Sequence, residues 1–173
     1  MNIGDILFVY GRAGTFISRL ICFFSKSEFS HVAQVIGFSP NGSEIVAEDL
    51  YNGSIIRSNP YRKEAYVLKT WTKPLSTKEE KTLIQYHYDT GGTYYAYHQL
   101  FRIAFYLFFS LSRRRSQELI NIRDPSICSE KIHETSILLG RDLRPDINPG
   151  LVTPQDLFES ELLREIPLRS LKI

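Results

Sequence analysis

Five short β-rich segments crowd the first 69 residues, and they constrain the fold more than any other feature of the sequence. Turn-forming glycine, proline and asparagine residues separate them. The segment 29–37 is apolar on both faces, which predicts a central strand. The turn Pro40-Asn41-Gly42 joins it to the next segment as an antiparallel hairpin. The five segments predict a curved sheet or small barrel: Gly4–Tyr10, Phe29–Gly37, Glu44–Leu50, Gly53–Arg57 and Ala65–Lys69.

Helix signals, each an N-cap residue or capping box before an apolar stripe, occur in four places. They begin at Thr15, Ser76, Ser126 and Thr153. The first of these helices is strongly apolar and predicts that Cys22 lies inside its packed face. The chain has 173 residues and 43% hydrophobic content, enough for a sizeable core. We therefore expect a single α+β domain spanning residues 1–173.

Cys128 falls on the first turn of the helix that Ser126 begins and Gly140 ends. Unpaired N–H groups and the positive end of the helix dipole favour a thiolate there, and the same N–H groups can bind an oxyanion. The alternative is that Cys128 is a small buried hydrophobe, as most unpaired cysteines are. Taken alone, Cys128 favours the buried hydrophobe, and only the rest of the chain shifts the balance toward a nucleophile.

Thiol chemistry also needs a base and a group that orients the base. His31 begins the central strand, and Glu48 lies on the strand expected to pair with it. Asp49 is the neighbouring alternative, but side chains alternate across a strand and only one of the two shares the face of His31. We prefer Glu48. The remaining histidines, His87, His98 and His133, fall on predicted helices and are expected to pack or to face solvent.

Composition excludes several classes of function. The net charge is only +2 and no basic stripe is present, so we expect no nucleic-acid partner. Two cysteines without paired ligand spacing indicate neither a disulfide framework nor a metal site. The start Met1–Asp5 has no basic region before an apolar run, which predicts cytoplasmic synthesis without a signal peptide. Reaching a cell wall then requires release by a phage or a secretion machine.

The most apolar stretch of the chain runs from Leu100 to Leu111 and precedes Arg113-Arg114-Arg115. Its roughly 12 residues are too few for a membrane span, which needs about 20. A buried helix is the simpler interpretation. The functional alternative is a surface helix that dips into lipid while the three arginines contact headgroups, giving peripheral membrane contact.

Five motifs in one order carry a family resemblance. They are Gly4–Phe8, Phe29–Gly37, Ala47–Glu48 before Gly53, Ile127–Glu130 and Thr153–Leu157. Together they resemble the circularly permuted papain-like cysteine hydrolases of the NlpC type, including the YiiX-like bacterial group and, more distantly, the lecithin retinol acyltransferase-like proteins. The resemblance spans about residues 4–160. Residues 94–123 match no family motif and predict a helical insertion.

The resemblance implies Cys128 as nucleophile, His31 as base and Glu48 as the polar third member. It also implies a small antiparallel sheet or barrel packed against the helix that carries the cysteine, and neither a metal nor a cofactor. Further candidates for oxyanion binding or substrate positioning are Tyr10, Tyr94, Tyr95 and Ser129.

Three functions are therefore considered. The first is a cysteine amidase or peptidase acting on peptide or amide bonds, with peptidoglycan as one substrate. The second is a lipid-directed thiol hydrolase or acyltransferase, suggested by Leu100–Leu111 and Arg113–Arg115. The third is a binding module that keeps the fold without catalysis. Because a base, an orienting carboxylate and a thiol occur together, we favour an enzyme acting on a peptide, amide or acyl substrate.

Overall fold

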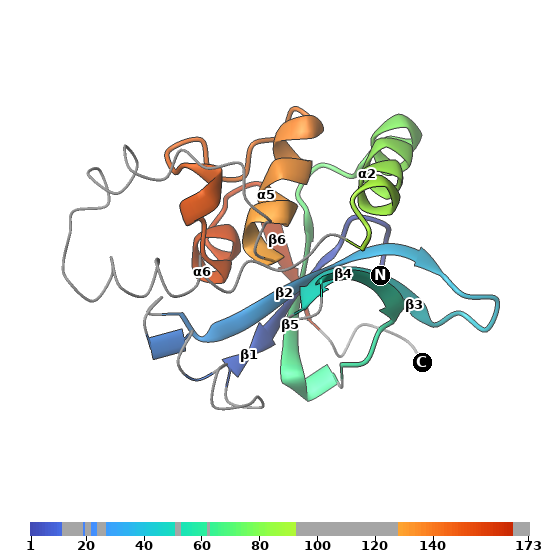
Figure 1. The fold of residues 1–173 in the computed structure, drawn as a ribbon, viewed down its shortest axis with the longest axis horizontal. Helices are drawn as coiled ribbons and strands as arrows, with labels where there is room; N and C mark the ends of the chain where they lie inside the picture. Colours follow the sequence, from blue (N-terminus) through green and yellow to red (C-terminus); the bar gives the residue numbers. More distant parts are fainter. Residues whose placement is uncertain are drawn as a thin grey trace.

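A six-stranded antiparallel sheet organises the protein (Figure 1). The computed structural model describes residues 1–11, 19, 22, 23, 27–50, 53–61, 63–92 and 128–167. The strands are β1 (Ile6–Tyr10), β2 (Phe29–Phe38), β3 (Glu44–Leu50), β4 (Gly53–Ser58), β5 (Tyr66–Trp71) and β6 (Leu163–Ile166). The helices are α2 (Thr77–Asp89), α5 (Cys128–Leu138) and α6 (Pro154–Phe158), with the 3₁₀ turns η2 (Lys63–Ala65) and η3 (Pro149–Leu151).

The strands lie in the order β4-β3-β2-β1-β5-β6, and each neighbouring pair is antiparallel. The predicted hairpin of β2 and β3 and the central place of β2 are confirmed. The sheet is open, so the barrel alternative was wrong. The sixth strand was not predicted. Its four residues pair with β5, from Trp71 opposite Leu163 to Leu68 opposite Ile166.

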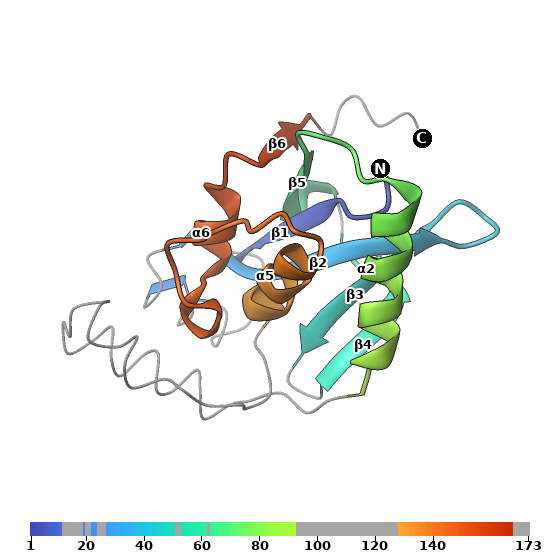
Figure 2. The same cartoon turned by 90° about the horizontal axis from the view of Figure 1, so that it is seen from above.

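Helices α2, α5 and α6 cover one face of the sheet (Figures 1 and 2). Strand alternation sends Ile6, Phe8 and Val32 to this face, where they pack with Ile132 of α5 and Leu157 of α6. The alternate residues form a second cluster on the opposite face: Leu7, Val9, Ala33, Val35, Val46, Tyr66 and Leu68. The sheet is thus buried on both sides, which explains the apolar character of β2.

Helix α2 begins with the predicted capping box: Ser76 accepts from the Glu79 backbone N–H, and the Glu79 carboxylate accepts from the Ser76 backbone N–H. Its buried Leu83 packs on Ile36 and Ala47 of the sheet. The helix is therefore fixed on the sheet near the pairing of β2 with β3.

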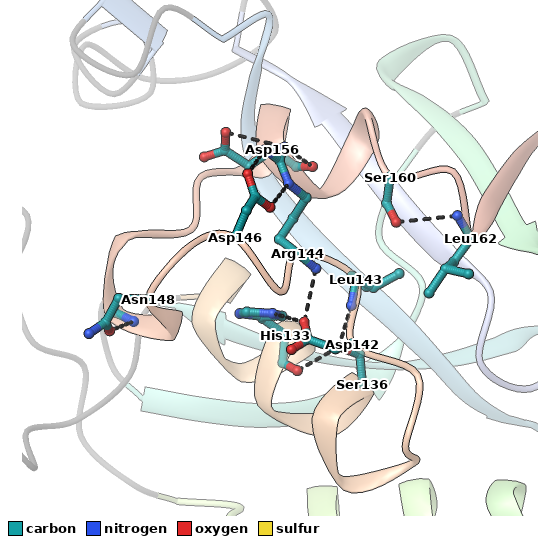
Figure 3. A network of polar contacts seen from close by, with 11 residues as sticks. His133, Ser136, Asp142, Leu143, Arg144, Asp146, Asn148, Asp156, Ser160 and Leu162 are labelled. Carbon is teal, nitrogen blue, oxygen red and sulfur yellow. Dashed lines mark hydrogen bonds and ion pairs between the residues drawn. The ribbon is translucent and has the colours of Figure 1, made fainter. Parts of the chain in front are cut away.

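The loop after α5 folds back onto that helix through polar contacts (Figure 3). His133 Nε2 donates to Asp142 Oδ1 across 2.6 Å, and the Arg144 backbone N–H donates to the same oxygen. The Arg144 guanidinium forms two hydrogen bonds with Asp146 and donates to the backbone carbonyl of Asp156 on α6. These bonds connect α5 to α6 and fix both helices over the same face of the sheet.

Several predictions lie outside the described residues. They are the apolar segment Leu100–Leu111, the arginines 113–115 and the helical insertion at 94–123. Of the predicted helix from Thr15, the structure describes only residues 19, 22 and 23, and there Cys22 is partly exposed rather than enclosed. Among the described residues, no helix has both the length and the hydropathy to cross a membrane.

We predict that Leu83→Ala lowers the free energy of unfolding by about 2–5 kcal/mol, because it leaves a cavity between α2 and the sheet. Leu138→Ala is the matched control, since Leu138 lies at the end of α5 with 55% of its surface exposed. It should change stability by less than about 0.5 kcal/mol. Urea unfolding followed by circular dichroism measures both values. Equal losses in the two variants would contradict the packing described for α2.

Candidate functional site

Cys128 is the first residue of α5, as the sequence predicted, and it is buried with 7% of its surface exposed. Gly140, with φ +68°, follows the end of the helix. The predicted N-cap, Ser126, lies outside the described residues. At the first turn of a helix the backbone N–H groups have no partner within the helix, and the helix dipole favours negative charge. The thiol therefore lies beside N–H groups that can bind an oxyanion.

His31 lies near the start of β2, opposite Val9 of β1. Its Nε2 donates to Glu48 Oε2 across 2.7 Å, and its side chain is 14% exposed. Because Nε2 is engaged by the carboxylate, Nδ1 is the ring nitrogen that can exchange a proton with another group. The charge and the side chain of Cys128 also act on this imidazole, where they raise the pKa of His31. The imidazole therefore interacts with both the thiol and the carboxylate.

Strand β3 presents its two adjacent carboxylates to opposite faces of the sheet. Glu48 shares the face of Val46 and contacts His31. Asp49 points to the helix-covered face, where its Oδ1 binds Lys131 of α5. The structure thus places Glu48 rather than Asp49 against His31, in line with the alternation argument.

The Glu48 carboxylate is entirely removed from solvent and is bound by two further side chains. Arg57 of β4 donates from Nε to Oε1 across 2.5 Å, and Tyr61 donates from its hydroxyl to Oε2. Sequence reasoning missed both residues. The β3–β4 register places Arg57 opposite Val46, diagonally beside Glu48, so a known register would have revealed it. Tyr61 follows Pro60 in a loop, and a loop has no periodic sequence pattern from which the direction of a side chain can be predicted.

These contacts set the ionisation of the site. Burial on its own raises the pKa of Glu48, but the hydrogen bonds and charge of His31, Tyr61 and Arg57 lower that pKa to about 2. Burial lowers the pKa of His31, but Cys128 and then Glu48 outweigh it and raise that pKa to about 10. Burial and the Glu48 charge raise the pKa of Tyr61, so its hydroxyl stays a neutral donor. At neutral pH the cluster holds a carboxylate, an imidazolium, a guanidinium and a phenol.

The other positioning candidates are placed differently. Tyr10 ends β1 opposite Phe29, and the two rings lie 5.1 Å apart between centroids. Ser129 is completely buried, and its hydroxyl donates to the Val152 carbonyl across 2.6 Å. That bond holds α5 against the segment before α6, so we assign Ser129 a structural role in place of the substrate contact expected from the sequence. Tyr94 and Tyr95 lie outside the described residues.

The histidines on the helices pack in the interior. His87 donates from Nε2 to Gln34 Oε1 across 2.9 Å, and burial and the charge of Lys131 lower its pKa to about 3. His133 is buried and binds Asp142. His98 lies outside the described residues. Of the histidines in the described part of the chain, only His31 is bonded to a glutamate.

Comparison with known proteins finds a likeness in structure but none in sequence. No family model matches the chain, and no curated protein matches it. Among solved structures it is similar to the crystal structure of the metalloprotein YiiX from Escherichia coli O157:H7 (DUF1105), with a TM-score of 0.62 and 20% sequence identity. The alignment covers 96% of each chain. At this identity the likeness shows a common fold, which is that of a YiiX-like protein.

We predict that Glu48→Gln removes part of the acid sensitivity of the fold. The folded pKa of about 2 lies below the ordinary value of 4.5, so wild-type Glu48 contributes stability above pH 4.5 and loses it as the pH falls toward 2. Ionised Glu48 contributes up to about 3 kcal/mol. Urea unfolding between pH 7 and pH 3 should show a smaller fall for Glu48→Gln than for wild type. Glu161→Gln, at an exposed position, is the control, and an equal fall in all three proteins would contradict the assignment.

Proposed function

We propose that the protein is a cysteine hydrolase of the permuted papain-like, NlpC type, with Cys128 as nucleophile, His31 as general base and acid, and Glu48 as the group that orients His31. The observation that carries the proposal is that the His31 imidazole has two partners. It binds a buried carboxylate through Nε2 and interacts with a thiol at a helix start. A nucleophile, a base and an orienting group linked in series form the arrangement that covalent acyl transfer requires.

In the acylation step, the Cys128 thiolate attacks the carbonyl carbon of an amide. A C–S bond forms while the carbonyl π electrons move to oxygen, and the oxyanion lies near the backbone N–H groups at the start of α5. The tetrahedral intermediate then collapses and the C–N bond breaks. The His31 imidazolium gives its proton to the leaving nitrogen, which departs as an amine and leaves a thioester on Cys128.

In the deacylation step, neutral His31 takes a proton from water as the oxygen attacks the thioester carbonyl. The second tetrahedral intermediate expels the Cys128 thiolate, and the carboxylic acid product leaves. The proton on His31 restores the imidazolium, so the enzyme returns to its starting charge state. Glu48 stays ionised throughout and keeps the Nε2 proton of His31 in place.

The substrate class that we propose is a peptide or amide bond, with peptidoglycan as one candidate. This choice rests on the resemblance of the five sequence motifs. The lipid-directed alternative remains a prediction from Leu100–Leu111 and Arg113–Arg115.

The description of YiiX as a metalloprotein raises the question of a metal in this chain. A protein metal site needs about three or more donors in one place. Across the described residues, no group of three or more histidine, cysteine, aspartate or glutamate side chains meets that condition. Both oxygens of Glu48 are already bound by Arg57, His31 and Tyr61. We therefore route no step of the reaction through a metal.

We predict that Cys128→Ala lowers amide hydrolysis by at least about 10³-fold, because no other group replaces the thiol as nucleophile. A panel of peptide anilides and peptidoglycan stem peptides measures the rate, and mass spectrometry of wild type with an activated acyl ester locates the acyl group on Cys128. Cys22→Ala is the control and should retain both activity and acylation. Full hydrolysis by Cys128→Ala would overturn the proposal.

We also predict that exhaustive dialysis against a chelator leaves hydrolysis and acylation of Cys128 unchanged, since no step uses a metal. Rates before and after dialysis, with metal content checked by mass spectrometry, give the result. A loss of activity that zinc or another divalent ion restores would contradict the thiol mechanism in this form.

A further inference from the structure

A buried lysine lies on the same helix as the proposed nucleophile. Lys131 follows Cys128 by three residues, close to one helical turn, and its side chain is only 6% exposed. Its ammonium group donates to Ser54 Oγ across 2.6 Å, to the Thr90 carbonyl across 3.3 Å and to Asp49 Oδ1 across 3.4 Å. All three N–H donors of the ammonium group therefore have an acceptor.

These acceptors belong to three different elements. Asp49 lies on β3, Ser54 on β4, and Thr90 caps the end of α2. The Ser54 hydroxyl also donates to Asp49 Oδ1, which closes a triangle of bonds around the ammonium group. The end of α2 is held at the same place, because the Gly92 backbone N–H donates to the Ser54 carbonyl.

Asp49 directly follows Glu48 on β3, and the two carboxylates face opposite sides of the sheet. Glu48 binds His31, and Asp49 binds the helix that carries Cys128. Strand β3 thus contacts both the proposed base, through Glu48, and the helix of the proposed nucleophile, through Asp49. A shift of α5 along β3 would separate Lys131 from its acceptors and would move Cys128 relative to His31 by the same amount.

We propose that Lys131 and Asp49 are positioning residues, which fix α5 on β3 so that the Cys128 thiol meets the His31 imidazole. This inference rests on the proposed thiol chemistry. A buried ion pair is a poor source of stability, because desolvation of both charges offsets their attraction and apolar residues of similar volume serve as well. The contribution of the ion pair is instead to fix the position of α5 on the sheet. Apolar packing of Ile132 tolerates small displacements of α5, whereas three acceptors around one ammonium group do not.

The test distinguishes an effect on the position of the Cys128 thiol from an effect on the stability of the fold. All variants carry Cys22→Ala, so that iodoacetamide reports on Cys128 alone. The readout is the alkylation rate at pH 6 divided by that at pH 10, where even an unassisted thiol is ionised. In wild type, pairing with His31 keeps this ratio high. Lys131→Met and Asp49→Asn are made singly and together, since the double variant leaves no unpaired charge in the interior.

The proposal predicts that the double variant recovers most of the urea midpoint lost by either single variant. Its alkylation ratio nevertheless stays about 10- to 100-fold below wild type, the size of effect expected when a reacting group is misplaced by about 1 Å. Glu134→Gln is the matched control: this residue is also on α5, but its carboxylate accepts from the Tyr86 hydroxyl across 2.6 Å, a bond that joins α5 to α2. It should lower the midpoint without changing the ratio.

Should the double variant not fold, Ser54→Ala replaces it, because it removes one acceptor of Lys131 and keeps the charge pair. A fall in its alkylation ratio is the expected result. A folded double variant, or Ser54→Ala, with the wild-type ratio would overturn the inference and leave the thiol chemistry intact. A wild-type protein with the ratio of an ordinary thiol would overturn the proposed function itself.

Discussion

The buried carboxylate of Glu48 is the interaction on which the candidate site depends. A charge fully removed from solvent is tolerated only where donors replace its water. Here three donors do so, and they come from separate parts of the chain: His31 from β2, Arg57 from β4 and Tyr61 from the loop before β5. To satisfy this one anion, the chain must bring these elements together. The imidazole is thereby held in one orientation and given one tautomer.

The thiol is brought to that imidazole by the helical layer. Helix α5 lies on the sheet with Ile132 in the core, Ser129 bonded to the segment before α6, and Lys131 bonded to β3. The loop after α5 bonds back to His133 and continues to α6 (Figure 3). Helix α5 is thus fixed by contacts with the sheet, with the segment before α6 and with the loop that follows it. The position of Cys128 depends on these contacts, which lie farther along the helix.

Local rules were enough to predict much of this arrangement. The capping box at Ser76 and the helix that begins near Cys128 follow from patterns a few residues long. Strand alternation allowed only one of Glu48 and Asp49 to face His31, and the structure shows that it is Glu48. The rest depends on tertiary pairing. Strand β6 has only four residues, too few for a sequence pattern, and it is defined by its pairing with β5. Arg57 lies beside Glu48 because of the β3–β4 register, which cannot be read from the sequence. Ser129 faces the core because of the rotation of α5 about its own axis. The apolar stripe of the sequence was not enough to predict that rotation.

The most direct test of the account is the titration of the His31 ring, followed by nuclear magnetic resonance in wild type and in Cys128→Ala. Wild-type His31 should be an imidazolium at neutral pH and should lose its proton near pH 10, because Cys128 and Glu48 outweigh burial and raise its pKa. Removal of the thiol should move the titration to a clearly lower pH while Glu48 stays bound. Identical titrations in the two proteins would show that Cys128 and His31 are not coupled, and would contradict the central claim.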